Sequence, residues 1–205
     1  MVWSCIFRKL LVWPAFCGLV VFLAVSSTRA DNNDSDIYQD GDDNDATVEQ
    51  IGNLNISAIN QLGDNNTAGT TQNGNENEST INQTGDGNDA TVDQVGNNNE
   101  SLINQTGNDN SADVSQIGDG NESDIEQIGN DNTASVLQDG DLNTSNILQS
   151  GNSNNADVEQ IGNLHFSDIQ QLGDGNIASV SQSGLSNTSN IVQSGNGNTA
   201  NVVQN

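Results

Sequence analysis

The chain has 205 residues and a formal net charge of −25, from 28 acidic and 3 basic side chains. Every Lys, Arg, Cys, Pro and Trp lies within residues 1–30, so residues 31–205 carry all the acids and no cation. Binding to nucleic acid phosphates needs Lys or Arg and is therefore excluded for this region. Disulfides, Cys-based metal sites and catalysis by Cys, Lys or Arg are excluded in the same way. The composition predicts a structural or binding protein and not an enzyme.

Residues 1–30 are typical of a secretory signal peptide. Arg8 and Lys9 form a basic start, an apolar run extends from Leu10 to Val25, and small residues precede Ala30. This run of about 16 residues is shorter than the roughly 20 that a membrane-spanning helix needs. We therefore expect cleavage after Ala30, export, and no membrane anchor on the mature chain. Residues 31–34 are interpreted as a short acidic spacer before the next feature.

From residue 35 onward the chain divides, without insertion, into units of eleven residues with the form (S/A)-x-(I/V)-x-Q-x-G-x-x-N-x. Fifteen complete units and one truncated unit fill residues 35–205. Successive units alternate between Ser with Ile and Ala with Val, so the full period is 22 residues and occurs about eight times. Position three departs from Ile or Val only at Thr70, and position ten departs from Asn only at His165.

The repeat is typical of β-structure, because positions one, three and five alternate with polar positions two and four. A helical coiled coil with an eleven-residue period is disfavoured, since each unit offers one aliphatic position and is rich in Gly, Asn and β-branched residues. The x-G-x-x-N segment predicts a turn. Two strands and two turns per 22 residues predict an all-β fold, a cross-β β-solenoid of about eight coils. Identical residues would then stack about 4.8 Å apart.

Stacking assigns a role to each invariant column. The side chains at position three should form the core: Ile37, Val48, Ile59, Ile81, Val92, Ile191 and Val202. The turns should use Gly and Asn: Gly41, Gly52, Gly63, Asn44, Asn55 and Asn66. The Gln side chains at position five should form amide ladders along the stack. These are Gln39, Gln50, Gln61, Gln72, Gln83, Gln94, Gln105, Gln116, Gln127, Gln138, Gln149, Gln160, Gln171, Gln182, Gln193 and Gln204.

Charge is graded along the chain, since residues 31–49 hold eight acids and residues 175–205 hold none. Natural proteins use charge to block pairing at sheet edges, so the neutral C-terminal coil is the better edge for accepting another chain. Val192 and Val203 stand at positions that are mostly polar elsewhere and mark this assembly end. Head-to-tail stacking of copies would be open-ended and would give a filament.

Acids spaced 22 residues apart should form columns of like charge. The two trios are Asp42, Asp64 and Asp86, and Glu78, Glu100 and Glu122. Two interpretations are open: divalent cations or acid gate the assembly, or the columns are a solvated surface that keeps monomers apart. No other cofactor is predicted. His165 is interpreted as a substitution within the Asn column.

The segment from Gln50 to Gln61, Q-I-G-N-L-N-I-S-A-I-N-Q, resembles the curlin repeat of bacterial curli fibre subunits, and the resemblance covers residues 35–205. It implies a secreted functional amyloid that forms a pilus-like fibre at the cell surface and supports adhesion and biofilm. The implied partners are further copies of the chain, a nucleator subunit and an outer-membrane secretion apparatus. Two alternatives are a fibre nucleator and a monomeric secreted β-solenoid that binds cations, a polysaccharide or ice.

Overall fold

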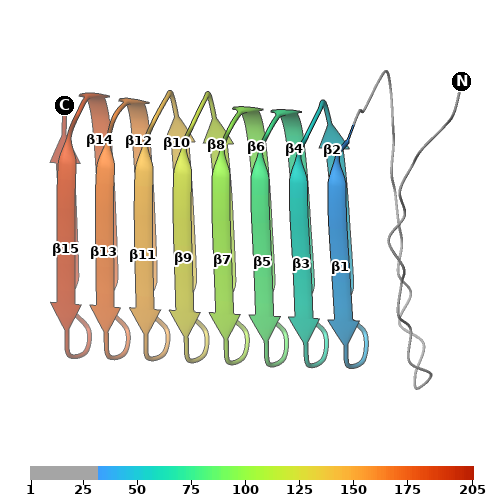
Figure 1. Ribbon diagram of the computed structural model, residues 1–205. Helices are drawn as coiled ribbons and strands as arrows, with labels where there is room; N and C mark the ends of the chain where they lie inside the picture. Colours follow the sequence, from blue (N-terminus) through green and yellow to red (C-terminus); the bar gives the residue numbers. More distant parts are fainter. Residues whose placement is uncertain (1–31) are drawn as a thin grey trace, which may run out of the picture.

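The computed structural model describes residues 32–205. The expected signal peptide and its cleavage after Ala30 lie outside the described residues. The described chain is all-β, and its sixteen strands alternate with short turns and stack as the coils of a β-solenoid (Figure 1). This confirms the predicted fold class and the 22-residue coil. Within residues 32–205, no helix is long and apolar enough to cross a bilayer.

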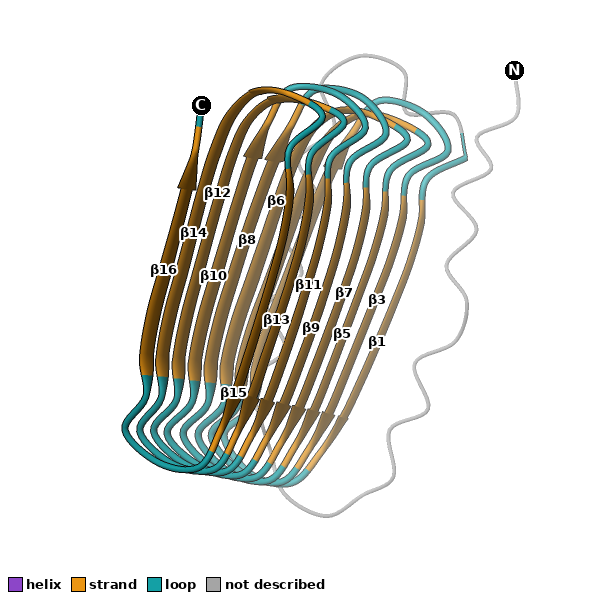
Figure 2. Ribbon diagram, turned by 90° about the vertical axis from the view of Figure 1, so that its left-hand side faces the viewer, coloured by secondary structure: helices purple, strands orange, loops and turns teal. Residues whose placement is uncertain are grey.

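Two parallel eight-stranded sheets face each other across the coil (Figure 2). One contains the odd-numbered strands: β1 (Asp34–Asp40), β3 (Ile56–Leu62), β5 (Glu78–Thr84), β7 (Glu100–Thr106), β9 (Glu122–Ile128), β11 (Thr144–Ser150), β13 (Phe166–Leu172) and β15 (Thr188–Ser194). The other contains the even-numbered strands: β2 (Asp45–Ile51), β4 (Thr67–Asn75), β6 (Asp89–Asn97), β8 (Ser111–Ile117), β10 (Thr133–Asp139), β12 (Asn155–Asn163), β14 (Ile177–Leu185) and β16 (Thr199–Gln204).

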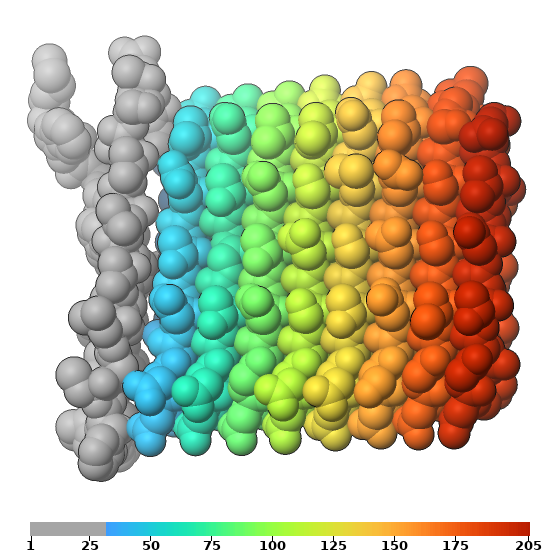
Figure 3. Space-filling model, turned by 180° about the vertical axis from the view of Figure 1, so that it is seen from behind, coloured from blue at the N-terminus to red at the C-terminus, as the bar shows by residue number. Residues whose placement is uncertain are grey.

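Every strand pairs with the strand one coil away at an offset of 22 residues. Ile37 therefore lies opposite Ile59, and Val136 opposite Val158. Side chains accordingly form straight rows that run from one end of the molecule to the other (Figure 3). A slip of one residue would turn the aliphatic side chains outward, so burial specifies this register.

The core is a column of Ile from the odd strands packed against columns of Val and Ala from the even strands. Ile81, Val92 and Ile103 are fully buried, and each such side chain contributes about 1.5–3 kcal/mol. The predicted core residues Ile59 and Ile191 are buried as well. The other three predicted core residues lie in the end coils and are only partly buried against the cluster: Ile37, Val48 and Val202.

Thr70, the one polar residue in the Val column, is buried and its Oγ1 lies 3.2 Å from Oγ of Ser79. Ser79 belongs to the buried Ser column of the odd strands. Six other hydroxyls of that column have no hydrogen-bond partner: Ser57, Ser101, Ser123, Ser145, Ser167 and Ser189. The departure from the repeat at Thr70 thus supplies a hydrogen bond that a Val would not.

The solenoid begins earlier than the predicted boundary at residue 35. Asp34 is the first residue of β1, and Oδ1 of Asn33 accepts a hydrogen bond from the backbone N–H of Asn55 at 3.0 Å. Asn33 precedes Asn44 by one unit and therefore belongs to the Asn column. The interpretation of residues 31–34 as a spacer is wrong for Asn33 and Asp34, because the pattern was counted only from complete units.

The glycine at position seven is required both by its backbone conformation and by the stacking. Gly107 has φ of 121°, in a region that side chains disfavour. A Cβ on Gly107 would also overlap the backbone carbonyl oxygen of Gly129 in the next coil. Gly69, in β4, differs on both counts, since its φ is not positive and a Cβ there would meet no atom within 4 Å.

We predict that Gly107→Ala destabilises the solenoid by about 3 kcal/mol or more, because backbone strain and steric overlap add. Gly69→Ala should instead stabilise it by about 0.5–1 kcal/mol, because the unfolded chain loses freedom. Urea unfolding of both variants measures the difference. Equal effects of the two substitutions would contradict the stacking argument.

Candidate functional site: the amide ladders and the two end coils

The Gln side chains at position five form two continuous ladders, one in each sheet. Except in Gln193 and Gln204 of the last coil, each Nε2 donates to Oε1 of the Gln in the following coil, over 2.7–3.0 Å. Each Nε2 beyond Gln39 also donates to a backbone carbonyl of the preceding strand, as Gln61 does to Asp45 at 3.0 Å. An interior Gln therefore links adjacent coils and also the two sheets. All the Gln donors point the same way, toward the C-terminal end.

The Asn side chains at position ten form a second pair of ladders with the opposite polarity. Nδ2 of Asn66 donates to Oδ1 of Asn44 at 3.1 Å and to the backbone carbonyl of Gly85 at 2.8 Å. Oδ1 of Asn66 accepts from both N and Nδ2 of Asn88, at 3.0 and 3.1 Å. The buried side chain thus uses every strong donor and acceptor it has, which explains why an amide recurs here.

A third ladder lies at position eight, which the sequence analysis did not single out. The backbone N–H of Asp42 donates to Oδ1 of Asp64 at 2.7 Å, and that of Asp64 donates to Oδ1 of Asp86 at 2.9 Å. Position eight is Asn or Asp in fourteen of fifteen units, the exception being Leu185. This recurrence of Asn and Asp is the feature of the sequence that could have predicted the ladder. The predicted acidic column Asp42, Asp64 and Asp86 is therefore part of an exposed ladder that caps backbone N–H groups.

His165 is buried within the Asn column and keeps part of its hydrogen bonding. Its backbone N donates to Oδ1 of Asn143 at 3.0 Å, and its Nδ1 accepts from the backbone N–H of Asn187 at 3.2 Å. Its Nε2 lies 3.3 Å from the carbonyl oxygen of Ile161. An accepting Nδ1 requires the neutral ring with the proton on Nε2. The prediction that His165 substitutes for Asn in the ladder fits this arrangement.

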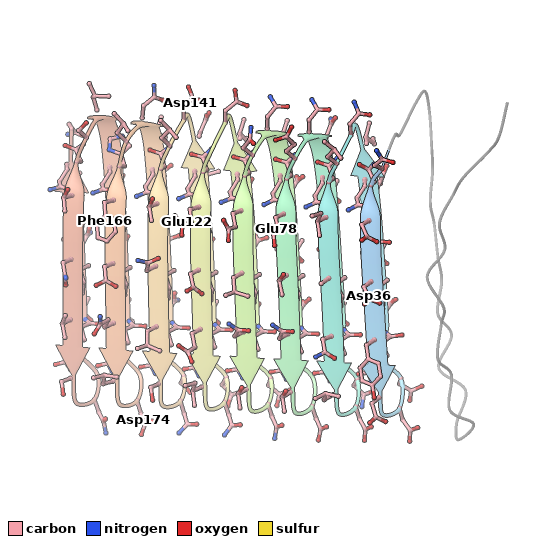
Figure 4. All side chains as sticks on the ribbon, viewed as in Figure 1. Asp36, Glu78, Glu122, Asp141, Phe166 and Asp174 are labelled. Carbon is pink, nitrogen blue, oxygen red and sulfur yellow. The ribbon has the colours of Figure 1, made fainter. Side chains whose placement is uncertain are left out.

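The second predicted acidic column lies where the odd-numbered strands begin, beside the turns that follow the even-numbered strands. Glu78, Glu100 and Glu122 are exposed and occupy equivalent positions in β5, β7 and β9 (Figure 4). Among the described residues, no group of three or more His, Cys, Asp or Glu side chains is arranged to hold a metal ion. A role for divalent cations therefore stays a prediction.

Three aspartates on the outer faces have a perturbed protonation equilibrium. Burial raises the pKa of Asp113, Asp124 and Asp157 above the usual 3.8, and neighbouring carboxylates raise it further. For Asp124 these neighbours are Glu126 and Glu122. Because the folded pKa exceeds the unfolded one, the ionised form opposes folding at neutral pH, and this penalty is lost as the pH falls through the folded pKa.

The two ends of the solenoid are complementary. Within residues 32–205, no coil precedes the edge formed by β1 and β2, so Oε1 of Gln39 and of Gln50 accepts nothing from that side. Likewise no described coil follows the edge formed by β15 and β16, so Nε2 of Gln193 and of Gln204 donates only to a backbone carbonyl of the preceding strand. The Asn column offers the reverse pairing, with the acceptor Oδ1 of Asn198 at the C-terminal edge.

Val192 and Val203 are 60% and 63% exposed, at outward positions of β15 and β16. They lie on opposite faces of the last coil, because the two strands belong to different sheets. The structure therefore does not join them into one apolar patch. Val192 and Val203, which the sequence predicts to mark the assembly end, therefore lie on the two opposite sides of the C-terminal edge.

The parallel coils, the enclosed aliphatic column and the amide ladders define a β-solenoid repeat protein. A family model described as the curlin associated repeat matches seven overlapping segments: residues 30–63, 63–96, 85–118, 96–129, 107–140, 129–162 and 166–195. The chain belongs to the curlin-repeat family. The matches leave out residues 163–165, which contain His165. No curated protein matches the chain.

Truncating a buried and an exposed amide in one turn should separate the two kinds of ladder. Asn110→Ala removes four side-chain hydrogen bonds and leaves buried groups unpaired, so we expect a loss of about 3 kcal/mol. Asn108→Ala removes only the exposed acceptor of Asp86 N–H and should cost about 1 kcal/mol or less. Chemical unfolding of both variants measures this, and equal losses would contradict the ranking.

Acidification from pH 7 to about pH 4 should relieve the penalty at Asp113, Asp124 and Asp157 and so raise the melting temperature. The triple Asp→Asn variant should be the more stable protein at pH 7 and should gain less on acidification. A parallel pH response in the two proteins would refute the assignment.

Proposed function

We propose that this protein is a structural subunit that stacks end to end into an extracellular fibre of the curli type. Family membership supports the class, because curlin-repeat proteins are structural. The observation that carries the proposal is the complementarity of the two end coils. Their unpaired strands and ladder groups match donor to acceptor only when the C-terminal edge of one copy meets the N-terminal edge of the next.

Continuing the 22-residue register across such a junction places like residues together. Ile191 lies opposite Ile37 of the next copy, Gln193 opposite Gln39, and a filament continues the core and the ladders without interruption. The partly buried end residues, such as Ile37, then gain the axial neighbour that they lack in the single chain. Each junction therefore buries apolar surface and completes directional hydrogen bonds.

Charge selects the same orientation. The first coil carries acids at outward positions: Asp34, Asp36, Asp40, Asp42, Asp43, Asp45 and Glu49. The residues that face them across the junction are all uncharged: Thr188, Asn190, Ser194, Asn196, Gly197, Thr199 and Val203. Contact between two N-terminal coils would instead bring together two edges that carry seven acids each. Head-to-tail growth is the orientation that avoids this repulsion.

The proposed setting follows from the same inference. A subunit of this kind is exported, assembles outside the cell and serves adhesion and a biofilm matrix. Its partners are further copies of the chain, with a nucleator and a secretion apparatus as the implied accessory components. No ligand chemistry or catalysis is part of the proposal.

Acids introduced into the last coil should slow fibre growth. The variant Thr188→Glu, Asn190→Asp, Asn196→Asp faces Asp34, Asp36 and Asp42 of the next copy, and each like pair costs roughly 0.9 kcal/mol before screening. We expect elongation from seeds to fall at least tenfold at low salt and to recover substantially in 1 M NaCl. Seeded growth followed by turbidity and electron microscopy, with diffraction at about 4.8 Å, measures this.

The matched control places the same substitutions two coils earlier, as Thr144→Glu, Asn146→Asp, Asn152→Asp. These positions are equivalent in the coil but lie away from both edges, so growth should be far less affected. Equal slowing by the two variants would indicate a general charge effect and not an end contact. A folded rod that stays monomeric at all concentrations would refute the fibre and favour a binding module.

A further inference from the structure

Exposed apolar side chains concentrate on one edge of the solenoid. The turns that follow the even-numbered strands lie along one edge, upper in Figure 1, which we call the even-turn edge. Ten of the seventeen exposed large apolar residues lie on it: Ile51, Leu54, Ile56, Val95, Ile117, Leu142, Ile161, Leu164, Phe166 and Leu185. The opposite edge carries four: Leu62, Ile128, Leu172 and Ile177.

Five of the ten form one cluster across neighbouring coils, which we call the leucine patch: Leu142, Ile161, Leu164, Phe166 and Leu185. Their exposed fractions lie between 38% and 67%. Leu142 and Leu164 are one coil apart in the same column, and Leu185 pairs with Asn163, the residue before Leu164. Figure 4 places Phe166 near this edge, with Asp141 projecting from the same row of turns.

Leucine is an unfavourable choice for these turns. Leu142 and Leu164 have φ of 58° and 60°, the left-handed conformation, which costs a bulky residue about 1–2 kcal/mol. Position nine is left-handed in every turn of the described solenoid. On the opposite edge its occupants are Asp, Asn, Gly and Ser, with no apolar residue.

Leu185 also interrupts the ladder of hydrogen-bond acceptors at position eight. It occupies position eight, where Asn or Asp otherwise accepts a backbone N–H from the preceding coil, as Asn163 accepts from Asp141 at 2.9 Å. A leucine offers no acceptor, and at 67% exposure it is the most exposed of the large apolar residues. The fold therefore gains little from the leucines at these positions, and strained or sacrificed local geometry of this kind is concentrated at functional sites.

We infer that the leucine patch is a lateral contact between two copies of this chain lying side by side within paired fibres. The inference rests on the proposed function, because only a fibre repeats the patch along one line. Five half-exposed side chains offer less than the roughly 800 Å² per partner of a stable interface, so two single rods associate weakly. A filament presents the patch once per eight coils, and many weak contacts then act together.

A second filament is the partner whose own repeat matches this spacing. Residues 142–144, 161–166 and 183–188, which form this edge from Leu142 onward, include no acid, so like-charge repulsion along the edge is smallest here. A smaller cluster of the same kind, Ile51, Leu54 and Ile56, lies on the same edge five coils earlier and adds a second contact per copy. The acids on the same edge remain a source of repulsion, so added salt should strengthen pairing: they include Asp141 and the column of Glu78, Glu100 and Glu122.

The test compares full-length protein with the variant Leu142→Asn, Leu164→Asn, Leu185→Asn. Asn tolerates the left-handed conformation and restores the acceptor at position eight, so this variant should be at least as stable as the natural protein. We expect its fibres to grow at the normal rate but to pair roughly tenfold less often by electron microscopy. Pairing of the natural fibres should increase between 50 mM and 500 mM NaCl.

The matched control is Leu62→Thr, Leu172→Thr, Ile177→Thr, which removes three exposed apolar side chains from the opposite edge. Thr is already present in those columns, at Thr84 and Thr199. The control should pair like the natural protein. Equal pairing of the Asn variant and the natural protein, or equal loss in both variants, overturns the inference.

Two further outcomes are decisive. If the protein forms rods but no fibres, the proposed function fails. A lateral contact between rods would then still raise the sedimentation coefficient of the natural protein with concentration, and the Asn variant would lack this rise. Rods without that rise overturn the lateral contact as well. Natural fibres that stay single yet cosediment with phosphatidylcholine vesicles through these leucines would assign the patch to a lipid surface and overturn it too.

Discussion

The self-compatibility of each column is the constraint on which this structure depends. Every residue meets the residue 22 positions later at one strand spacing, so each side chain must pack with a near copy of itself. Aliphatic side chains satisfy this by burial, and amides satisfy it because each carries donors and an acceptor. Gly satisfies it at position seven, where the carbonyl of the next coil leaves no space for a Cβ. The absence of Pro from residues 31–205 follows from the same rule, since Pro cannot donate to the ladder.

The constraint also explains why so much of the fold was predictable from the sequence. A strict period with two unlike halves specifies strands, turns, register and the identity of the core, and the β-solenoid with 22 residues per coil is confirmed. The Gln and Asn ladders were expected from stacking alone. Their polarity was not, because it depends on which amide group faces the following coil. That polarity, opposite for Gln61 and Asn66, makes the two ends of the molecule unlike.

Other features of the structure could not be predicted from the repeat, because several residue types occur at the positions concerned. Position eight varies between Asn and Asp. The charge of the Asp residues predicts a column of like charges, whereas the property that Asn and Asp share is a side-chain oxygen that accepts a hydrogen bond. Position nine has the left-handed backbone in every turn, yet its residues are mixed, and this concealed the strain at Leu142 and Leu164. The start of the solenoid was misplaced because Asn33 belongs to an incomplete unit. Sequence periodicity identifies what repeats, and the structure was needed to show what the variable positions share.

The residues that are informative about function therefore lie chiefly at the variable outward positions and where the sequence departs from the repeat. The inward columns are nearly uniform and would serve any stack of this kind, so they determine stability more than identity. The outward positions are unconstrained by stacking, and there the chain departs from uniformity in an ordered way: acids fill the first coil and are absent from the last. Charge so placed costs each coil little within the chain and would impose direction at the junction that we propose between chains. The leucines of the even-turn edge depart from the pattern against local backbone preference, and this cost is the observation behind the lateral contact that we propose.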